Sequence, residues 1–485
     1  MAYRQFGKRT ILNLEDLLGL QKNAKGFKRL DFVVRYLAIL EYHGKGNGTI
    51  NGIELYCKMQ ERRSGKKNLR FAERRLIKLI NSYEQKGYDQ KEAIILDKNL
   101  QLIDGSHRLA MAIYYNIRDV NVVIVNRAYY VEDYSVHWFY QNGFTNEEID
   151  LIESTASRIR TIHETVFTGI IWASAMHVKE DILKDLGRFG CIRKAEEFCY
   201  AKEMQYEAIV KKLYAIDDIK EWKIVSKYEH MREKGRKLCA FHLEISDPEY
   251  RKKQTGMPIS ISIEKIKRNI RQRYKDKISD YYYDVIVHIA DNTTQSRYMD
   301  MVLWPELPMG EFLNILRKHE CAIIKYETPY FPLDFPNSIP IGRDVDILCI
   351  KEDFEELFIE LLKAAQRVKN SELYVRSAYR GSNNWQIRFE ASGKLLLLFD
   401  ISCMLPHLSE EFTYAAIKTR QKHRDYYVLD YRYEYLVRMC AYVNDKRKEY
   451  HLEYMKHYRD KFDPSIAYRY MKKKMIRDIE RKIAE

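Results

Sequence analysis

Short apolar runs bounded by turn residues are spread along the whole chain and alternate with stretches of helical periodicity. Residues 93–96 and 100–103 are two such runs on either side of a polar turn, Asp97-Lys98-Asn99, and this pattern predicts a β-hairpin. Residues 109–113 are apolar or strong helix formers. We therefore expect a hairpin that leads directly into a helix.

The same pattern continues downstream. Further strands are expected over residues 224–228, 241–245, 284–292, 341–350 and 394–402. Residues 132–160 and 354–368 have the periodicity of helices instead, and no repeat of fixed period interrupts the chain. The predicted fold class is a mixture of α/β and α+β segments in a multidomain chain.

The length of the chain sets the number of folded segments. At 485 residues it is too long for one hydrophobic core, and roughly 150 residues per domain predicts about three segments. We expect a first segment over residues 1–130, a helical connector over 131–165, a second segment over 166–305, a third over 309–405 and a helical, basic tail over 406–485.

The charge balance indicates which classes of ligand the protein favours. Lys and Arg number 83 against 69 Asp and Glu, so the net charge of +14 favours anionic ligands such as nucleotides, phosphosugars, nucleic acid or acidic lipid. Part of the excess lies in the tail, at Lys472, Lys473, Lys474, Arg477, Arg481 and Lys482. A solvated helix face is the simpler interpretation of these residues, and a weak contact with a membrane surface or another polyanion is the alternative.

Cysteine usage and hydropathy indicate the compartment. The eight cysteines are scattered, and none forms a C-x-x-C pair, so neither a zinc site nor a disulfide framework is predicted. No signal-type leader follows the first residues, and no run of about 18 apolar residues occurs. We expect a cytoplasmic bacterial protein.

The clearest chemical signature is the run Asp104-Gly105-Ser106-His107-Arg108, placed where the hairpin meets the helix. A strand-to-helix turn offers unpaired backbone N–H groups, and Ser106, His107 and Arg108 add donors suited to phosphate oxygens. Gly105 permits close backbone approach, whereas Asp104 repels phosphate unless it holds Mg²⁺ or accepts a substrate proton. The combination predicts a phosphoryl-transfer site.

Residues 71–125 resemble the ParB/sulfiredoxin-like fold, whose members carry a D-G-x-H-R or G-x-H-R turn. This resemblance implies a nucleotide site for ATP or CTP, in a superfamily that includes DNA-binding CTPases, sulfinic-acid reductases and free-serine kinases. Ser106 stands where the reductases have cysteine, and no helix-turn-helix array follows the motif. The small-molecule kinase is therefore the preferred interpretation.

Such a kinase needs a carboxylate base for the substrate hydroxyl. Glu54 and Glu61, upstream of the motif, are the candidates, and we favour Glu54. A charge on a helix surface is the alternative explanation for either glutamate.

In the second segment, an apolar run ends at His288 and Asp291, downstream of Arg271. A strand-end histidine near an arginine is the arrangement that a phosphohistidine or phosphate clamp requires. Residues 167–304 resemble the nucleoside diphosphate kinase fold, and this implies that His288 is phosphorylated and that Arg271 contacts phosphate. The usual lysine of the first strand and the Gly-Ser after the histidine are missing, so an inactive scaffold is the competing interpretation.

In the third segment, Asp344 and Asp346 occupy alternate positions of an apolar strand, so both carboxylates lie on one face. Asp400 ends a second apolar run. Three converging carboxylates suit one or two Mg²⁺ ions.

Residues 312–402 resemble the nucleotidyltransferase fold, which implies that Asp344, Asp346 and Asp400 hold metal over a nucleoside triphosphate. The usual G-S helix start is absent upstream, and Arg376, Arg380 and Arg388 are candidates to compensate for it. Solvated surface arginines are the simpler interpretation of the same residues.

No P-loop, nucleophile-elbow, zincin or strand-linked G-x-G-x-x-G motif occurs, which excludes those enzyme classes. The sequence predicts a Mg²⁺-dependent phosphotransferase and nucleotidyltransferase that uses ATP or CTP. Its expected acceptor is a small hydroxylated metabolite or a surface-polysaccharide precursor. The alternative is a nucleic-acid-binding or nucleotide-sensing regulator whose later segments are inactive scaffolds.

Overall fold

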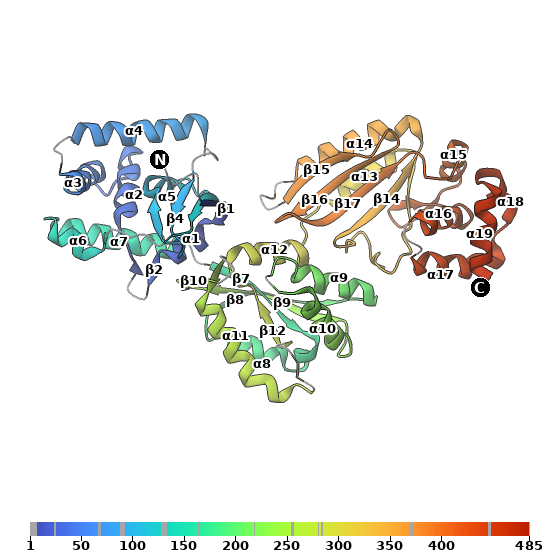
Figure 1. The fold of residues 1–485 in the computed structure, drawn as a ribbon, viewed down its shortest axis with the longest axis horizontal. Coiled ribbons are helices and arrows are strands. Elements are labelled where there is room, and N and C mark those ends of the chain that lie inside the picture. Colours follow the sequence, from blue (N-terminus) through green and yellow to red (C-terminus); the bar gives the residue numbers. More distant parts are fainter. Residues whose placement is uncertain are drawn as a thin grey trace. The chain divides into compact units, whose positions relative to one another are not determined.

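The structure, a computed structural model, describes most of the chain. The described residues are 7–23, 26–65, 69–87, 93–127, 133–162, 165–217, 219–253, 257–279, 281–282, 285–368, 370, 373–444 and 448–484. It is a mixed α/β multidomain protein with several sheets, and about half of it is helical (Figure 1). The predicted mixed class is confirmed at this level.

The chain folds into two compact units. Unit 1 comprises residues 1–171, 177–196 and 239–296, and unit 2 comprises residues 172–176, 197–238 and 297–485.

Unit 1 contains a four-stranded sheet of order β1-β6-β4-β5. Its strands are β1 (Gly7–Asn13), β4 (Ile94–Leu96), β5 (Leu102–Asp104) and β6 (Asp119–Val125). The predicted hairpin is confirmed as the antiparallel pair β4 and β5, which leads into helix α5 (Ser106–Tyr114). Strand β4 also pairs in parallel with β6, so the hairpin lies inside the sheet and the turn after Asp104 sits at a strand end.

Helices surround this sheet. They are α1 (Leu14–Leu20), α2 (Asp31–Tyr42), α3 (Gly52–Ser64), α4 (Leu69–Lys86), α6 (Val136–Gln141) and α7 (Asn146–Ile162). Helix α2 packs against both α3 and α5, which brings residues more than 50 positions apart in the sequence to the turn. Helices α6 and α7 fall in the stretch where helical periodicity predicted helix, residues 132–160.

A second four-stranded sheet has the order β12-β7-β9-β8. Its strands are β7 (Thr165–Trp172), β8 (Cys191–Cys199), β9 (Lys237–Ile245) and β12 (Val287–Ile289). Helices α8 (Lys179–Leu186) and α11 (Ile261–Tyr274) and the short pair β10 (Tyr250–Lys252) with β11 (Pro258–Ser260) belong to the same stretch of the chain. Another short pair, β2 (Lys22–Asn23) with β3 (Gly26–Phe27), follows α1. The strand expected over 284–292 is shorter than predicted, and its first residue, Asp284, lies outside the described residues.

One predicted strand is wrong. Residues 224–228 belong to helix α10 (Glu221–Arg232), although 241–245 are confirmed within β9. The apolar pair Ile224-Val225 is flanked by Lys, Glu and Met residues that favour helix, so local β-propensity is outweighed. Unit 2 also contains helix α9 (Glu203–Leu213) and most of α12 (Thr293–Leu303).

The largest sheet, in unit 2, has seven strands in the order β15-β16-β17-β14-β13-β19-β18. They are β13 (Cys321–Ile324), β14 (Arg343–Cys349), β15 (Leu373–Tyr379), β16 (Asn384–Ala391), β17 (Lys394–Ser402), β18 (Gln421–His423) and β19 (Tyr426–Val428). Helices α13 (Met309–Lys318) and α14 (Lys351–Gln366) pack against each other and against this sheet (Figure 1). The predicted helix over 354–368 corresponds to α14, which lies between the predicted strands β14 and β17 along the chain.

The tail forms a helical cluster of α15 (Glu410–Lys418), α16 (Tyr431–Asn444), α17 (Glu449–Tyr458), α18 (Pro464–Tyr470) and α19 (Lys473–Ala484). Their apolar side chains share one core, in which Ile476 and Ile479 of α19 are fully buried. The apolar face of α19 is thus covered by protein, whereas its basic residues Lys473, Lys474, Arg477 and Arg481 are exposed. Among the described residues, none of the helices has the length and apolar character needed to cross a membrane.

Candidate functional site

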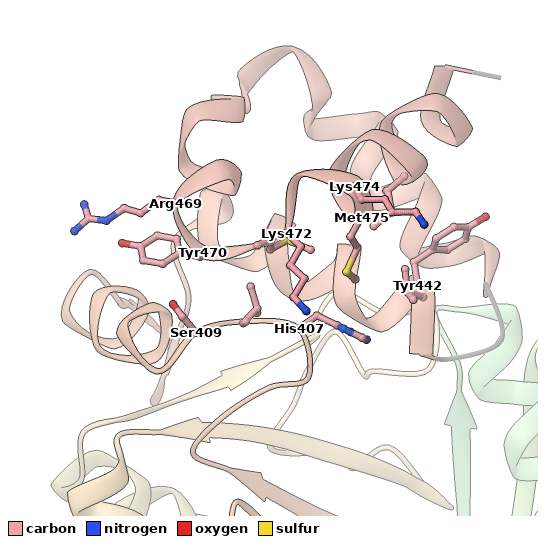
Figure 2. A pocket seen from close by; sticks show the side chains of 12 residues that line it. His407, Ser409, Tyr442, Arg469, Tyr470, Lys472, Lys474 and Met475 are labelled. Atoms are coloured by element: carbon pink, nitrogen blue, oxygen red, sulfur yellow. The ribbon is translucent and has the colours of Figure 1, made fainter.

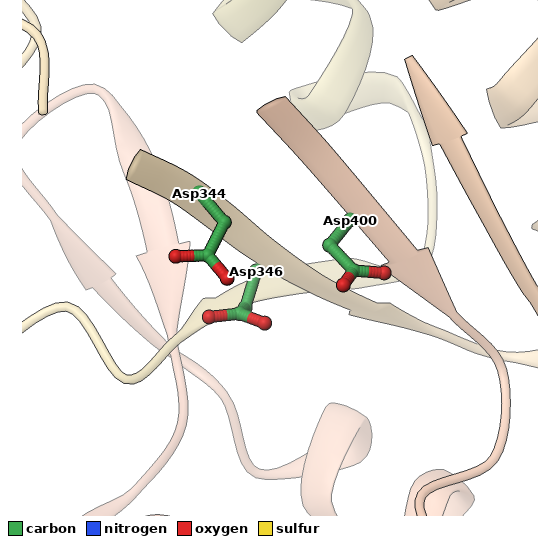
Figure 3. A group of neighbouring side chains, drawn as sticks. All are labelled: Asp344, Asp346 and Asp400. Atoms are coloured by element: carbon green, nitrogen blue, oxygen red, sulfur yellow. The ribbon is translucent and has the colours of Figure 1, made fainter. Parts of the chain in front are cut away.

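Two neighbouring strands of unit 2 bring three carboxylates together (Figure 3). Strands β14 and β17 are parallel, and their register places Asp346 directly beside Asp400. Asp344 lies two residues before Asp346, on the same face of β14. One oxygen from each of the three side chains lies within 4.8 Å of the others. The structure therefore unites Asp344, Asp346 and Asp400; we call this group the carboxylate triad.

The triad is electrostatically strained without a cation. Burial of Asp346 and the negative charges of Asp344 and Asp400 raise the pKa of Asp346 to about 7. Lys325 opposes this shift, because its Nζ lies 2.8 Å from Oδ1 of Asp346. Burial is the largest cause of the raised pKa, and Lys325 does not offset burial together with the two neighbouring negative charges.

Strand β16 orients Asp400. Gln386 lies directly opposite Asp400 in the antiparallel β16–β17 register, and its Nε2 donates to Oδ2 of Asp400 at 3.1 Å. The amide of Asn384 donates to the other oxygen of Asp400 and, at 2.7 Å, to the hydroxyl of Ser402. Such bonds hold a carboxylate in one rotamer, as they do around metal-binding carboxylates. The sequence signal for this pairing is two amide side chains at alternate positions of an apolar strand.

Basic residues lie next to the triad. A small cavity of about 50 Å³ is lined by Asp344 and Asp346 together with Lys325, Arg343 and Lys448. The guanidinium of Arg343 lies 3.8 Å from the centre of the Tyr330 ring. Cations beside a carboxylate cluster are the arrangement that binds a phosphate chain and its metal together.

A buried side chain of α16 holds the backbone of Lys325 in place. Its backbone N–H donates to Oε1 of Glu434 at 2.9 Å, and the same oxygen accepts from Nε of Arg438 at 2.7 Å. Glu434 and Arg438 are both fully buried. A buried ion pair on α16 thus anchors the loop that carries Lys325.

Two of the three arginines that were candidates for the triphosphate, Arg376 and Arg388, pair with Glu390, and the third, Arg380, is exposed directly after β15. Nε of Arg388 lies 3.1 Å and Nε of Arg376 lies 3.4 Å from Glu390. Lys325, Arg343 and Lys448, which the sequence analysis did not select, are the cations that line the cavity beside the triad.

The second site is the turn at residues 104–108 in unit 1. Gly105 has a φ of 108°, and a Cβ on it would lie 3.1 Å from the Cα of Ile94, so the turn requires glycine. Asp104 is exposed, and its Oδ1 accepts the N–H of Gly105 at 2.8 Å. Arg108 donates to the carbonyl of Ala93 at 3.1 Å, and this bond fixes the helix start to β4.

His107 is locked between two side chains. Nε of Arg35 donates to its Nδ1 at 3.4 Å, so the proton is placed on Nε2, which lies 2.9 Å from the hydroxyl of Tyr56. Burial and the charges of Arg35, Arg75 and Arg63 hold the pKa of His107 well below its usual range. His107 is therefore a neutral ring at physiological pH, and its Nδ1 lone pair already accepts from Arg35.

A buried ionic cluster supports this turn. Asp31 is fully buried and accepts from Nε of Arg29 at 2.7 Å and from Nη1 of Arg35 at 2.9 Å. Arg29 also donates to the carbonyl of Leu102 at 2.8 Å and contacts the Oγ of Ser106 at 3.4 Å. The positive charge around the motif therefore comes from four arginines, with Asp31 as the buried counter-charge.

Glu54 is not brought to this turn. It is exposed in the first turn of α3, whereas Tyr56, which contacts His107, is buried two residues later. Two residues correspond to about 200° around a helix, so the two side chains lie on different faces.

His288 lies in the edge strand β12 and is largely buried. Arg271 donates to the carbonyl of Val287 at 2.9 Å, and Lys267 donates to that of Ile289 at 3.1 Å and pairs with Asp291. Side chains of α11 thus donate hydrogen bonds to backbone carbonyls at the open edge of the sheet. A pocket of about 450 Å³ on this side is lined by Arg271 and Asp291, and His288 is not among the described residues that line it.

Comparison of the chain with models of known protein families gave no match, and comparison with curated proteins gave none either. The functional assignment therefore depends on the geometry of these sites.

Proposed function

We propose that unit 2 is a Mg²⁺-dependent nucleotidyltransferase or phosphotransferase that uses a nucleoside triphosphate, with a small hydroxylated metabolite or surface-polysaccharide precursor as acceptor. The observation that carries this proposal is the carboxylate triad on β14 and β17, with cations beside it. The resemblance of residues 312–402 to the nucleotidyltransferase fold supports the same assignment. We also propose that the first segment has the ParB/sulfiredoxin-like fold and that the second has the nucleoside diphosphate kinase fold.

The donor set fits a hard divalent cation. Three carboxylate oxygens within 4.8 Å are the ligands that Mg²⁺ and Mn²⁺ prefer. A bound Mg²⁺ would supply charge neutralisation for a triphosphate. The chain's own contribution is that Gln386 and Asn384 orient Asp400, and that Lys325, Arg343 and Lys448 bind phosphate oxygens.

The proposal is tested with the full chain, Mg²⁺, ATP or CTP labelled in turn at the α- and γ-phosphate, and a metabolite extract. We expect metal-dependent transfer of one of the labels to an acceptor, and pyrophosphate release if the α-label moves. Asp344→Asn should reduce the rate by more than about 100-fold, because it removes an exposed ligand without disturbing the core.

The matched control is Asp425→Asn, an exposed aspartate of unit 2 outside the triad, which should keep the wild-type rate. Absence of any Mg²⁺-dependent label transfer by the wild type, with both nucleotides and both labels, would count against a transferase.

We propose a second, nucleotide-binding function for the turn at 104–108 in unit 1. The specific observation is the concentration of arginines around His107, and the resemblance to the ParB/sulfiredoxin-like fold supports ATP or CTP as the ligand and a kinase of the free-serine type. In this proposal His107 is a neutral ring held between Arg35 and Tyr56 rather than a base. The proton acceptor that we propose at this turn is Asp104.

Arg75 provides a clean test of the second site. It is exposed on α4, and its charge acts on His107, so Arg75→Ala should weaken ATP or CTP binding by roughly tenfold through loss of a phosphate contact. Calorimetry on the full chain measures this, with Arg74→Ala as the charge-matched neighbour. Equal affinities of the two variants would mean that general charge, not a site at the turn, binds the nucleotide. Tighter, steeply salt-dependent binding of duplex DNA would favour the regulator instead.

A further inference from the structure

A cavity of about 910 Å³ lies within the helical cluster of unit 2, apart from the carboxylate triad (Figure 2). Its walls come from the loop before α15, the end of α16, the end of α18 and the start of α19. Leu408, Val443, Met471, Met475 and Ile479 supply apolar walls. A concave, largely apolar space of this size is typical of sites for small molecules.

The charge of the cavity has one sign. Arg469, Lys472 and Lys474 line it together with His407, and no carboxylate is found among the described side chains that line it. Figure 2 shows Lys472 and His407 on one side of the cavity near Met475. The ring of His407 is fixed by a contact of 3.1 Å between its Nε2 and Oδ1 of Asn444. Apolar walls with basic residues beside them complement a molecule that has an apolar chain and an anionic head.

The lining lacks the side chains that read adenine and cytosine. Amide side chains recognise the edge of adenine and carboxylates that of cytosine, and none of the described lining residues is Asn, Gln, Asp or Glu. The apolar face of α19 is already packed against the protein through Ile476 and Ile479, so the helix does not itself insert into a bilayer. The cavity, not the helix, offers the apolar surface.

We propose that this cavity binds a phosphate-headed lipid of a membrane, with the acyl chain against Val443 and Met475 and the phosphate against Lys472 and Lys474. None of its lining residues belongs to the triad, so the proposal does not depend on the proposed transfer reaction.

The direct probe is dioctanoyl phosphatidic acid, titrated into the full chain below its micelle concentration and followed by calorimetry. We expect saturable binding with one lipid per chain. Inorganic phosphate and dioctanoyl phosphatidylcholine should bind at least about tenfold more weakly, because the first lacks the chain and the second carries no net charge. Vesicles of phosphatidylcholine should capture the protein only when phosphatidic acid is included.

Two variants test the cavity itself. Val443 is 43% exposed, so Val443→Asp places a carboxylate in the cavity without disturbing the core, and it should weaken lipid binding at least about tenfold. The double variant Lys472→Ala and Lys474→Ala should do the same. The matched control is Lys473→Ala, which removes one exposed charge between them that does not line the cavity, and should change affinity by less than about threefold.

Each other outcome overturns the proposal. Equal affinity for inorganic phosphate would reduce the cavity to an anion site. Displacement of the lipid by single-stranded DNA at lower concentration than by phosphatidic acid would make it a nucleic-acid site. Wild-type lipid affinity in Val443→Asp, with an unchanged melting curve, would show that the lipid binds elsewhere.

Discussion

Asp346→Asn should abolish the stabilisation of unit 2 by Mg²⁺ while leaving the metal-free protein at least as stable as the wild type. Asp346 is the central member of the triad, directly beside Asp400 in the β14–β17 register and two residues from Asp344. Its pKa is raised to about 7, so its surroundings disfavour the charged form even though Lys325 is close. A neutral amide removes this repulsion in the metal-free state.

The effect on function should be large. Loss of a ligand is expected to lower turnover and metal affinity by more than about 100-fold, since losses of 10–100-fold already follow from removing a residue that only orients a ligand. Gln386→Ala is such a case, because Gln386 only holds Asp400, and it should give an intermediate loss.

Melting curves of the full chain with and without Mg²⁺ and ATP or CTP, with calorimetry of Mn²⁺ binding, measure both effects. Wild-type melting that ignores millimolar Mg²⁺ even with nucleotide present would mean that the triad is no metal site, and unit 2 would then be a scaffold.

Asp31→Ala should destabilise unit 1 by roughly 3–5 kcal/mol, because it leaves two buried guanidinium groups without their counter-charge. Asp31 has no exposed surface, and Arg35 and Arg29 are 2% and 5% exposed. Arg35 contacts His107 and Arg29 contacts Ser106, so the variant should also lose nucleotide binding at the turn.

The loss should depend on pH. Burial alone would raise the pKa of Asp31, but Arg35 and Arg29 more than compensate and hold it well below the ordinary value. A lowered pKa contributes stability above the unfolded value of about 4, and this contribution is lost as the pH falls through the folded value. The difference between wild type and Asp31→Ala should therefore be constant near neutral pH and shrink below about pH 4.

Hydrogen exchange of the amides of α2 and α5 in the full chain reports this stability locally. Asp150→Ala, an exposed aspartate of α7 in the same unit, is the control and should stay within about 0.5 kcal/mol of wild type. A loss at Asp31 no larger than at Asp150 would show that the arginines find water or other partners.

The features that the sequence determined by itself are local ones. The hairpin over 93–104 and the helix after it follow from turn residues and short apolar runs, and the shared face of Asp344 and Asp346 follows from the two-residue period of a strand. Local composition also predicted a strand wrongly at 224–228, where two β-branched residues lie within a helical stretch.

Tertiary structure decided what completes each site. Asp400 joins the triad only because β17 pairs with β14 in a particular register, and Lys325 and Lys448 reach it from segments more than 100 residues apart. The phase of α3 presents Tyr56, not Glu54, to His107, and the packing of α2 brings Arg35 there. Strand register, helix phase and packing depend on contacts between distant parts of the chain, and hydrophobic pattern along a single sequence carries no record of them.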